Sequence, residues 1–379
     1  MENDRNKKPG VLFILPDLGA GGAQPMNLRL AQQLASRGWA VRVAILFNRP
    51  QLVPELSLKD LEVRHLNAQS TFSKLMLPLR LALHARKSDI VIGGMELAAT
   101  NYGFCAARLA RRAFVSWTHI AYNEHQYTTG KIDRCISKLI FRHTDRIVFP
   151  SAGARDSLKL ALGNQRARTD WRVIANFSES SCPKINTAPS EAFRKPCIIS
   201  VGRLVSQKAF ARLIRVHAKL RREGHAHHLV IVGDGPLRDE LEEAAENLGV
   251  HETVFLPGHS DNVADWLRHA TVFALCSNYE GFSLALLEAL DAGLPTVAMD
   301  CPSGPREILQ NGYVGVLTEL GDESAFQKAL SCLLTSKNLR NTLSQRAKKR
   351  AADYRPEYIV PLWEDFLLSA IRTRDSKRE

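Results

Sequence analysis

The chain has 379 residues, of which 45% are hydrophobic and 24% are charged, a balance that is ordinary for a folded globular protein. This length predicts two hydrophobic cores, and the composition excludes a chain that is disordered as a whole. The seven cysteines are dispersed and include no CxxC pair, which favours a reducing compartment over a disulfide framework or a zinc site. No apolar run reaches the roughly twenty residues that a membrane span requires, so we expect a cytoplasmic protein.

The positive charge is confined to the first half of the chain. Residues 1–175 hold 26 Lys and Arg against 13 Asp and Glu, whereas the remaining residues hold 25 against 26. Basic residues and an apolar series at helical spacing interleave in residues 131–146, the series being Ile132, Ile136, Leu139, Ile140 and His143. Such a helix could lie on an anionic membrane, or it could pack on the core with a solvated basic side, and both interpretations stay open. No nucleic-acid-binding module accompanies the charge, so nucleic acid is not an expected partner.

Short β-rich runs alternate with helical patterns along the chain. In the first half the runs span residues 11–16, 41–46, 89–94, 113–119, 146–151 and 171–176. Residues 178–196 are polar and contain three prolines, which indicates a linker. The runs then continue at residues 197–203, 228–235, 253–258, 272–277 and 295–299. We therefore predict an α/β chain with two doubly wound parallel-sheet domains, whose ligands bind beyond the carboxyl ends of the strands.

A glycine-rich turn follows the first run and leads into a helix that Gly38 would end. Gly21 and Gly22 could let main-chain amides approach a phosphate, or they could serve only the tight turn. Gln24 stands where a dinucleotide fingerprint would need its third glycine, which disfavours a nicotinamide-dependent dehydrogenase.

Two cations follow the first run of the second half. Arg203 and Lys208 are suited to a diphosphate, because arginine offers a flat fork of donors and lysine a compact charge, although surface cations are often only solvated. Three glycine-containing turns follow at residues 233–241, 256–259 and 300–308, and Pro305 in the last of these would begin a helix.

The most informative segment is residues 280–288, EGFSLALLE. Glu280 lies in a strand-to-helix loop, and Ser283 is placed to cap a helix that begins at Leu284. Glu288 falls on the apolar side of that helix, where an ionised carboxylate needs a hydrogen-bond partner. A polyhydroxylated ligand would supply this partner, as would an arginine or solvent.

These motifs together resemble those of the retaining glycosyltransferases of sequence family 4, which have the GT-B fold. The resemblance covers nearly the whole chain and rests on GGAQ at 21–24, GRL and QK within 202–208, GDGPLRDEL at 233–241, EGFSLALLE and GLPTVA at 293–298. It implies an acceptor-binding domain over residues 1–177, a linker over 178–196, a nucleotide-sugar-binding domain over 197–354, and a final helix over 355–379 that packs back on the first domain.

The resemblance also implies roles for individual residues. Arg203 and Lys208 would hold the donor diphosphate and stabilise it as a leaving group, Glu280 would contact the sugar hydroxyls, and Glu288 would hold the ribose. His119 would lie near the reacting sugar, so the catalytic set would be His119, Arg203, Lys208 and Glu280. The backbone around these residues would contact the substrates at Gly21, Gly22, Gly258, Gly281, Phe282, Ser283 and Leu284.

The implied activity is that of a hexosyltransferase at the inner face of the bacterial cytoplasmic membrane. It would move a hexose or N-acetylhexosamine, with retention, from a UDP-sugar to a glycan, polyprenyl-diphosphate-linked or lipid A-core acceptor in surface polysaccharide assembly. The sequence contains no acidic DxD, so no metal and no other cofactor is expected. A glycoside hydrolase with paired carboxylates and a non-catalytic basic binding protein are the alternatives. The chain departs from the family pattern at Gln24, where Glu is usual, and at Ala209, where Gly is usual, which affects the expected loop geometry more than the chemistry.

Overall fold

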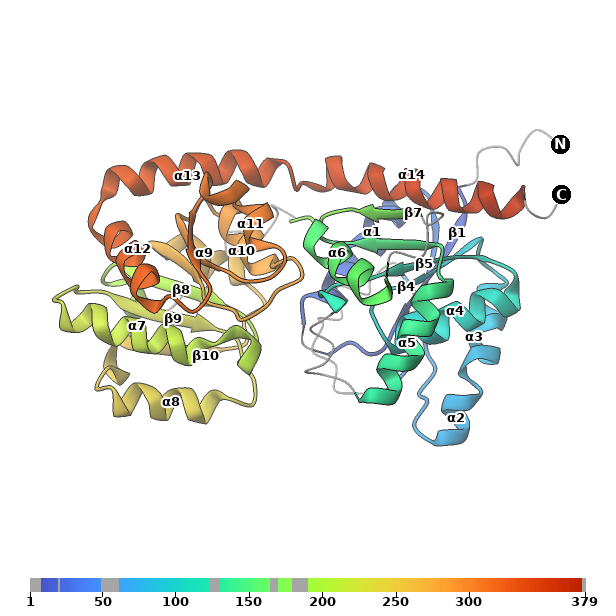
Figure 1. The fold of residues 1–379 in the computed structure, drawn as a ribbon, viewed down its shortest axis with the longest axis horizontal. Helices are drawn as coiled ribbons and strands as arrows, with labels where there is room; N and C mark the ends of the chain where they lie inside the picture. The colour runs from blue at the N-terminus through green and yellow to red at the C-terminus, as the bar shows by residue number, and fades with distance from the viewer. Residues whose placement is uncertain are drawn as a thin grey trace. The chain divides into compact units, whose positions relative to one another are not determined.

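The computed structural model describes residues 8–19, 21–48, 61–122, 130–163, 170–178 and 190–376. The chain divides into two compact units, unit 1 comprising Met1–Asn176 with Pro356–Glu379, and unit 2 comprising Phe177–Arg355 (Figure 1). Most of the predicted linker lies outside the described residues, and its last part contains the 3-10 helix η3 (Ser190–Phe193).

Unit 1 contains a parallel sheet of seven strands in the order β3-β2-β1-β4-β5-β6-β7. The inner strand β1 is buried along its whole length, as expected for an apolar run that helices cover on both faces. The strands are β1 (Gly10–Leu15), β2 (Ala40–Ile45), β3 (Glu62–His65), β4 (Ile90–Gly93), β5 (Ala113–Trp117), β6 (Arg146–Phe149) and β7 (Asp170–Val173).

Seven α-helices of unit 1 are described: α1 (Ala23–Ser36), α2 (Thr71–Leu75), α3 (Leu77–Ala85), α4 (Ala98–Ala110), α5 (Lys131–His143), α6 (Ala152–Leu162) and α14 (Pro356–Asp375). Leu12 and Ile14 of β1 form one hydrophobic core with α3 and α4. The C-terminal helix α14 contacts α1, β4 and β5, and its Glu364 accepts hydrogen bonds from Lys8 Nζ at 2.6 Å and Trp39 Nε1 at 2.9 Å. The C-terminal segment thereby becomes part of the first unit.

Unit 2 contains a parallel sheet of six strands in the order β10-β9-β8-β11-β12-β13. The strands are β8 (Cys197–Val201), β9 (His228–Val232), β10 (Val254–Gly258), β11 (Val272–Leu275), β12 (Thr296–Asp300) and β13 (Val316–Glu319). The helices are η4 (Ser206–Lys208), α7 (Phe210–Arg222), α8 (Arg238–Asn247), η5 (His251–Thr253), α9 (Val263–His269), α10 (Leu284–Asp291), α11 (Pro305–Ile308), η6 (Gln310–Gly312), α12 (Glu323–Thr335) and α13 (Lys337–Ala352).

The two sheets share one strand order, and its direction of progression reverses between β1 and β4 in unit 1 and between β8 and β11 in unit 2. In open α/β sheets, ligands bind beyond the carboxyl ends of the strands at such a reversal. The fold class predicted from the sequence is confirmed, and most of the predicted site residues lie near the two reversals, whereas Gly258 ends the edge strand β10.

The structure of the basic helix α5 contradicts one of the two interpretations that its sequence left open. Ile136 and Leu139 are exposed, and among the α5 side chains that the structure describes, those of Ser137 and Phe141 are buried. The interpretation in which the side of α5 with Ile136 and Leu139 packs on the core is therefore wrong. None of the helices in the described part of the chain has both the length and the apolar character needed to cross a membrane.

Candidate functional site

The site in unit 2 centres on an ion pair between residues that follow β8 and β11. Lys208 Nζ donates to Glu280 Oε1 at 2.6 Å, and Ser277 Oγ donates to the same oxygen at 2.7 Å. The side chains of Lys208 and Glu280 are only 15% and 6% exposed. A cation and a carboxylate, 72 residues apart in sequence, are thus held together at the reversal of strand order.

Glycines allow the backbone around Lys208 to pack closely. A Cβ on Gly202 would lie 3.0 Å from Lys208 Cε, and a Cβ on Gly233 would lie 2.0 Å from the Gly202 carbonyl oxygen. The Leu204 amide donates to the Asp234 carbonyl at 3.0 Å. The glycine turn at 233–235 therefore packs directly against the 202–204 turn, which gives the GDG motif a structural role.

Arg203 lies in the same turn but is not part of the ion pair. Its side chain is exposed, and within the described residues no hydrogen bond or ion pair engages its guanidinium group. The guanidinium donors of Arg203 are available to an anion.

The 280–284 loop is held by its neighbours and leaves backbone donors unused. Gly304 has φ +91°, and a Cβ there would lie 3.2 Å from the Gly281 carbonyl oxygen. The Phe282 ring packs edge-on against Tyr354, with centroids 5.5 Å apart. Ser283 Oγ caps α10 by accepting from the Leu286 amide, as the sequence predicts. Among the described residues, no acceptor is found for the amides of Gly281, Phe282, Ser283 and Leu284, which therefore present N–H groups at a helix N-terminus to an anion.

Glu288 is half-buried on α10 and is engaged within the protein. The fully buried residues of this helix are Leu286, Leu287, Ala289 and Leu290. Glu288 thus lies at the border of the buried face, and the expected position on the apolar side is corrected accordingly.

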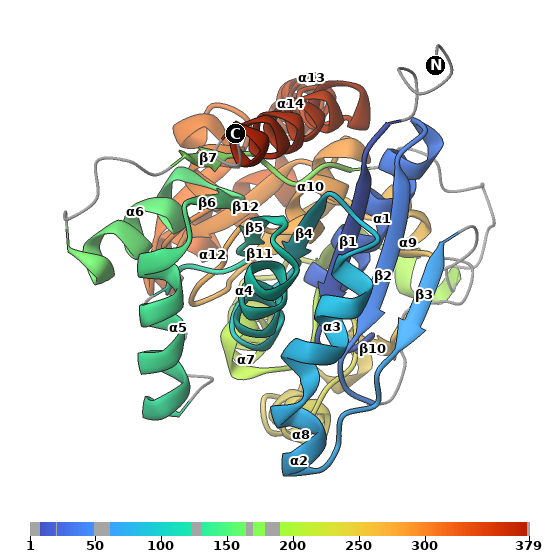
Figure 2. The same cartoon turned by 90° about the vertical axis from the view of Figure 1, so that its right-hand side faces the viewer.

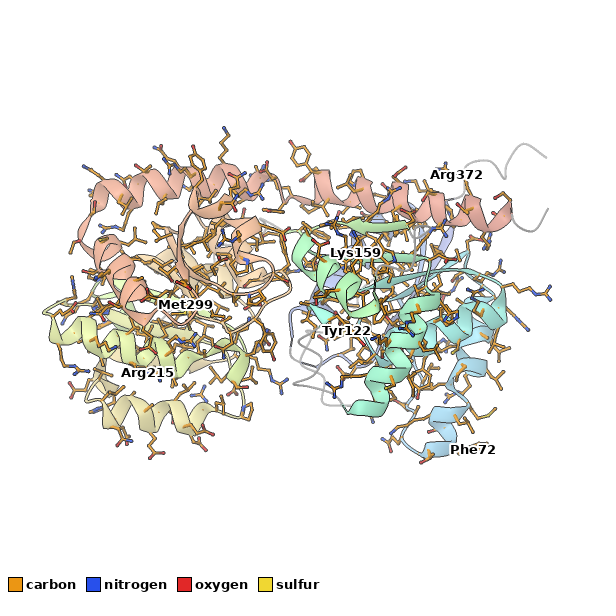
Figure 3. The ribbon with its side chains drawn as sticks, in the orientation of Figure 1. Phe72, Tyr122, Lys159, Arg215, Met299 and Arg372 are labelled. Atoms are coloured by element: carbon orange, nitrogen blue, oxygen red, sulfur yellow. The ribbon has the colours of Figure 1, made fainter. Side chains whose placement is uncertain are left out.

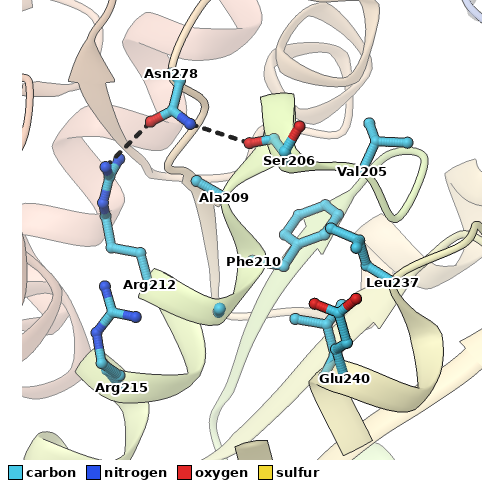
Figure 4. Close-up of a pocket in the computed structure, with 11 residues that line it drawn as sticks. Val205, Ser206, Ala209, Phe210, Arg212, Arg215, Leu237, Glu240 and Asn278 are labelled. Carbon is cyan, nitrogen blue, oxygen red and sulfur yellow. Dashed lines mark hydrogen bonds between the residues drawn. The ribbon is translucent and has the colours of Figure 1, made fainter.

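A cavity of about 300 Å³ lies beside this site in unit 2, and Figure 4 shows the residues that line it. It is not lined by Lys208 or Glu280. At its rim, Asn278 Nδ2 donates to the Ser206 carbonyl at 3.0 Å, and Arg212 donates to Asn278 Oδ1 at 3.1 Å. Since Ser206 and Asn278 each precede a member of the ion pair by two residues, these bonds fix the two loops against each other.

Ala209 adopts the left-handed conformation, with φ 51° and ψ 37°. An L-residue pays about 1–2 kcal/mol there, which exceeds the entropic cost of glycine. We expect Ala209→Gly to raise the free energy of unfolding by about 0.5–1 kcal/mol, measured from urea unfolding midpoints. Ala211→Gly, inside α7, is the matched control and should lower it by about 1 kcal/mol. A destabilised Ala209→Gly protein would contradict the observed backbone.

His119 follows β5 in unit 1 and is fixed by a buried carboxylate. Glu96 accepts hydrogen bonds from the amides of His119 and Ile120. Burial lowers the pKa of His119, although the Glu96 charge and the Gly94 carbonyl act in the opposite direction. His119 Nε2 lies 2.9 Å from the Gly94 carbonyl oxygen and 3.1 Å from Asn27 Nδ2. At neutral pH the imidazole is uncharged, and a proton on Nε2 would bond to Gly94.

The glycine turn after β1 is organised by Asp17 and Gln24. Asp17 Oδ1 accepts from the Gly19 amide and from Gln24 Nε2, both at 3.1 Å. A Cβ on Gly21 would lie 3.0 Å from Gln24 Oε1, so this glycine is in close contact with the glutamine, while Gly22 is the N-cap of α1. A glutamate at position 24 would instead place a second carboxylate beside buried Asp17, which explains why glutamine suits this chain.

Two family models match the chain: glycosyltransferase family 4 over residues 20–177, and glycosyl transferases group 1 over residues 184–350. N-acetyl-alpha-D-glucosaminyl L-malate synthase of Bacillus anthracis is 30% identical, over 93% of this chain and 95% of that protein. The crystal structure of Anabaena Alr3699/HepE in complex with UDP and glucose superposes with a TM-score of 0.81 at 19% identity, covering 95% of this chain and 100% of that one. The chain belongs to the GT-B glycosyltransferases.

Other relatives match this glycosyltransferase over most of its length or over about half of it. An enzyme of Campylobacter jejuni, N-acetylgalactosamine-N,N'-diacetylbacillosaminyl-diphospho-undecaprenol 4-alpha-N-acetylgalactosaminyltransferase, is 28% identical over 90% of this chain and 94% of its own length. The amylovoran biosynthesis glycosyltransferase AmsD of Erwinia amylovora is 35% identical over 171 residues, which span about half of each protein, 45% of this chain and 47% of that one.

In this glycosyltransferase, only part of the predicted site is brought into contact. Lys208 touches Glu280, Arg203 follows the same strand, and Gly281 to Leu284 form the adjoining loop. Gly258 ends β10, and its carbonyl accepts from the Gly233 amide at 2.8 Å. His119, Gly21 and Gly22 form a separate group at the strand reversal of unit 1. Their roles towards substrates stay predictions.

Sequence reasoning missed several polar residues that shape both groups: Ser277, Glu96, Asn27 and Asp17. Asp17, Glu96 and Ser277 lie in the loops after strands at the reversal points, and Asn27 lies in the helix after β1. The signal that could have found Glu96 is an acidic residue just after the buried run of β4, because a carboxylate there must be hydrogen-bonded.

Proposed function

We propose that this glycosyltransferase is a retaining enzyme of family 4 that transfers a hexose or N-acetylhexosamine from a UDP-sugar. The acceptor is a glycan, a polyprenyl-diphosphate-linked saccharide or a lipid A-core, within bacterial surface polysaccharide assembly. The observation that supports this most directly is the buried contact of Lys208 with Glu280 beside the unused amides of the α10 N-terminus.

The leaving group explains why cations are needed. Breaking the bond from the anomeric carbon to a nucleoside diphosphate leaves negative charge on phosphate oxygens and positive charge on the sugar ring. Lys208 is held in place by Glu280 before substrate arrives, so little reorganisation is required when this charge develops. Arg203, exposed in the same turn, adds donors for the same diphosphate.

The carboxylates are assigned to the neutral parts of the donor. Glu280 would accept from hydroxyls of the sugar with the oxygen that Lys208 and Ser277 do not occupy. Glu288, at the border of the buried face of α10, would hold the ribose. Gly258 would lie beside the base. UDP as the nucleotide is supported by the likeness to the Anabaena protein crystallised with UDP and glucose.

Retention follows from attack of the acceptor hydroxyl on the face from which the diphosphate departs. The new bond forms between the acceptor oxygen and the anomeric carbon, and the departing phosphate oxygen takes the hydroxyl proton. We assign acceptor binding to unit 1, where Gly21, Gly22 and neutral His119 lie at the strand reversal.

The acceptor class is supported by what relatives are named for. The Campylobacter jejuni relative is named for an undecaprenyl-diphosphate-linked acceptor, and a Rhizobium meliloti relative, 27% identical, is named for lipopolysaccharide core biosynthesis. We therefore place the enzyme at the inner face of the cytoplasmic membrane. The cations Lys208 and Arg203 supply the charge that the leaving diphosphate needs, so we propose that transfer requires no metal and continues in EDTA.

Hydrolysis by paired carboxylates is less consistent with this site. A glycosidase needs two carboxyl groups that flank one bond, one of them protonated as the acid. Glu280 is instead paired with a lysine, and Glu288 lies on α10, beyond the loop that holds Glu280.

A donor screen tests the proposal. Thermal stabilisation by UDP-sugars, followed by UDP release that depends on a lipid-linked acceptor, is the expected result. Stabilisation by free oligosaccharide together with its hydrolysis would favour the hydrolase, and no response to any nucleotide sugar would reject the donor assignment.

A further inference from the structure

Helices α2 and α3 of unit 1 expose a row of large apolar side chains, Phe72, Leu75, Leu79 and Leu83, which we call the apolar ridge. The spacing of three and four residues places them along one side of the two consecutive helices. Phe72 and Leu75 are 73% and 74% exposed, which is unusual for such side chains, and a contiguous apolar patch of this kind marks an interaction site. Figure 2 shows α2 at the outer end of α3, and in Figure 3 Phe72 lies at its tip.

The opposite side of α3 packs on the core, whereas α2 has no buried residue. Leu77, Leu81 and Ala85 are fully buried and pack with β1 and β4 residues. The ridge therefore consists of a second apolar side that the fold of unit 1 does not use. If α3 had only its contact with the core to make, polar residues would be expected in place of Leu79 and Leu83.

The charges beside the ridge define the partner. No acidic residue occurs between Glu62 and Asp89, whereas Lys74, Arg80, Arg86 and Lys87 lie within or directly after the two helices and are exposed. Burial lowers the pKa of His84, and the neighbouring cations Arg64, Lys87 and Arg80 act in the same direction, although Glu62 opposes them. Large apolar side chains flanked by several cations match the boundary between acyl chains and anionic headgroups.

Helix α5 extends this surface. Contacts join α3 to α4 and α4 to α5, so the three helices lie side by side in unit 1. The exposed Ile136 and Leu139 of α5 accompany Lys138 and Arg142 on the same helix. The combination of apolar and basic residues thus recurs on two elements of one unit.

We infer that the apolar ridge of α2 and α3 inserts into an anionic lipid bilayer, with Lys74, Arg80, Arg86 and Lys87 at the headgroups. This deepens the proposed function, on which it rests, because a lipid-linked acceptor is confined to such a bilayer. Insertion of apolar side chains would make binding only partly sensitive to salt, whereas purely electrostatic binding would be abolished.

Flotation of the full chain with phosphatidylglycerol-containing vesicles tests the inference. We expect F72S/L75S to lower the partition coefficient about tenfold or more, since each buried side chain contributes roughly that factor. Leu160→Ser on α6 is the matched control, because Leu160 is 78% exposed but outside the ridge, and it should bind as wild type. Wild-type binding should fall in about 0.5 M salt yet stay above that of F72S/L75S, and should be weak on phosphatidylcholine vesicles.

Equal binding of F72S/L75S and wild type would overturn the inference. So would dimerisation of wild type in sedimentation that F72S/L75S abolishes without any vesicle binding, since a second copy would then cover the ridge. Thermal stabilisation of both proteins by UDP-sugars is measured in parallel without vesicles. Its absence would count against the donor site alone, and a failure on vesicles would count against the ridge alone.

Discussion

Replacing Lys208 by alanine is expected to reduce the turnover number for sugar transfer by about 100- to 1,000-fold, the usual effect of losing one preorganised charge at a leaving group. Lys208 Nζ lies 2.6 Å from Glu280, so its position is set before the donor binds. Without it, the developing phosphate charge would face an unpaired Glu280, and Arg203 would be the cation left in that turn. The measurement is UDP release with an acceptor at saturating donor.

The fold should survive this substitution, because Ser277 still donates to Glu280 and the core of unit 2 does not include Lys208. Lys349→Ala, at an exposed position of α13, is the control and should keep wild-type turnover. Wild-type turnover in the Lys208→Ala protein, with unchanged melting, would reject the leaving-group role.

A double variant separates the cation from the carboxylate. If Glu280 harms the Lys208→Ala enzyme by its unpaired charge, K208A/E280Q should be no slower than K208A, although E280Q alone is impaired. Multiplicative losses would indicate that the two side chains act independently, against the contact that joins them.

The strands that the sequence misses are edge strands without an apolar run. The apolar runs of β1, β4 and β8 were recognisable because helices cover both of their faces. β3 and β13 are short edge strands with half-exposed side chains, and their sequences, EVRH and VLTE, contain no apolar run. Pairing with a neighbouring strand, which local sequence does not encode, decides their conformation.

Some residues of the candidate site could be predicted from the sequence, and others could not. Lys208 and Glu280 occur in motifs whose spacing indicates chemistry, and the structure brings them into contact. Ser277 could not be foreseen, because a lone serine after a strand resembles many others until the chain brings Glu280 back onto it. Likewise, Glu96 gains its meaning from the amides of the loop after β5, 23 residues later.

Acid should destabilise unit 2 through a buried pair of histidines. His217 on α7 and His227 before β9 are 0% and 1% exposed, and His217 Nδ1 lies 2.9 Å from His227 Nε2. His217 Nε2 is 2.9 Å from Thr253 Oγ1, and His227 Nδ1 is 3.0 Å from the His225 carbonyl oxygen. Each ring nitrogen of the two imidazoles thus has a hydrogen-bond partner within the protein.

Burial lowers the pKa of His217 to about 3 and that of His227 to about 4, while the unfolded chain has a value of about 6.5. Below about pH 6.5 the unfolded state therefore binds more protons than the folded state, and stability is lost as the pH falls from about 6.5 towards about 4. Between about pH 7 and pH 5 each histidine should lower the free energy of unfolding by about 2 kcal/mol.

Urea unfolding at about pH 7 and pH 5, followed by hydrogen exchange of peptides from α7 and β9, measures this loss in unit 2 itself. The variant H217L/H227L has no group to protonate, so its stability should change much less between the two pH values even if it is lower at both. His251→Gln, at an exposed position of η5, should retain the wild-type dependence. If H217L/H227L and wild type lost the same free energy on acidification, the buried pair would not be its source, since only the folded state keeps these two imidazoles from taking up protons.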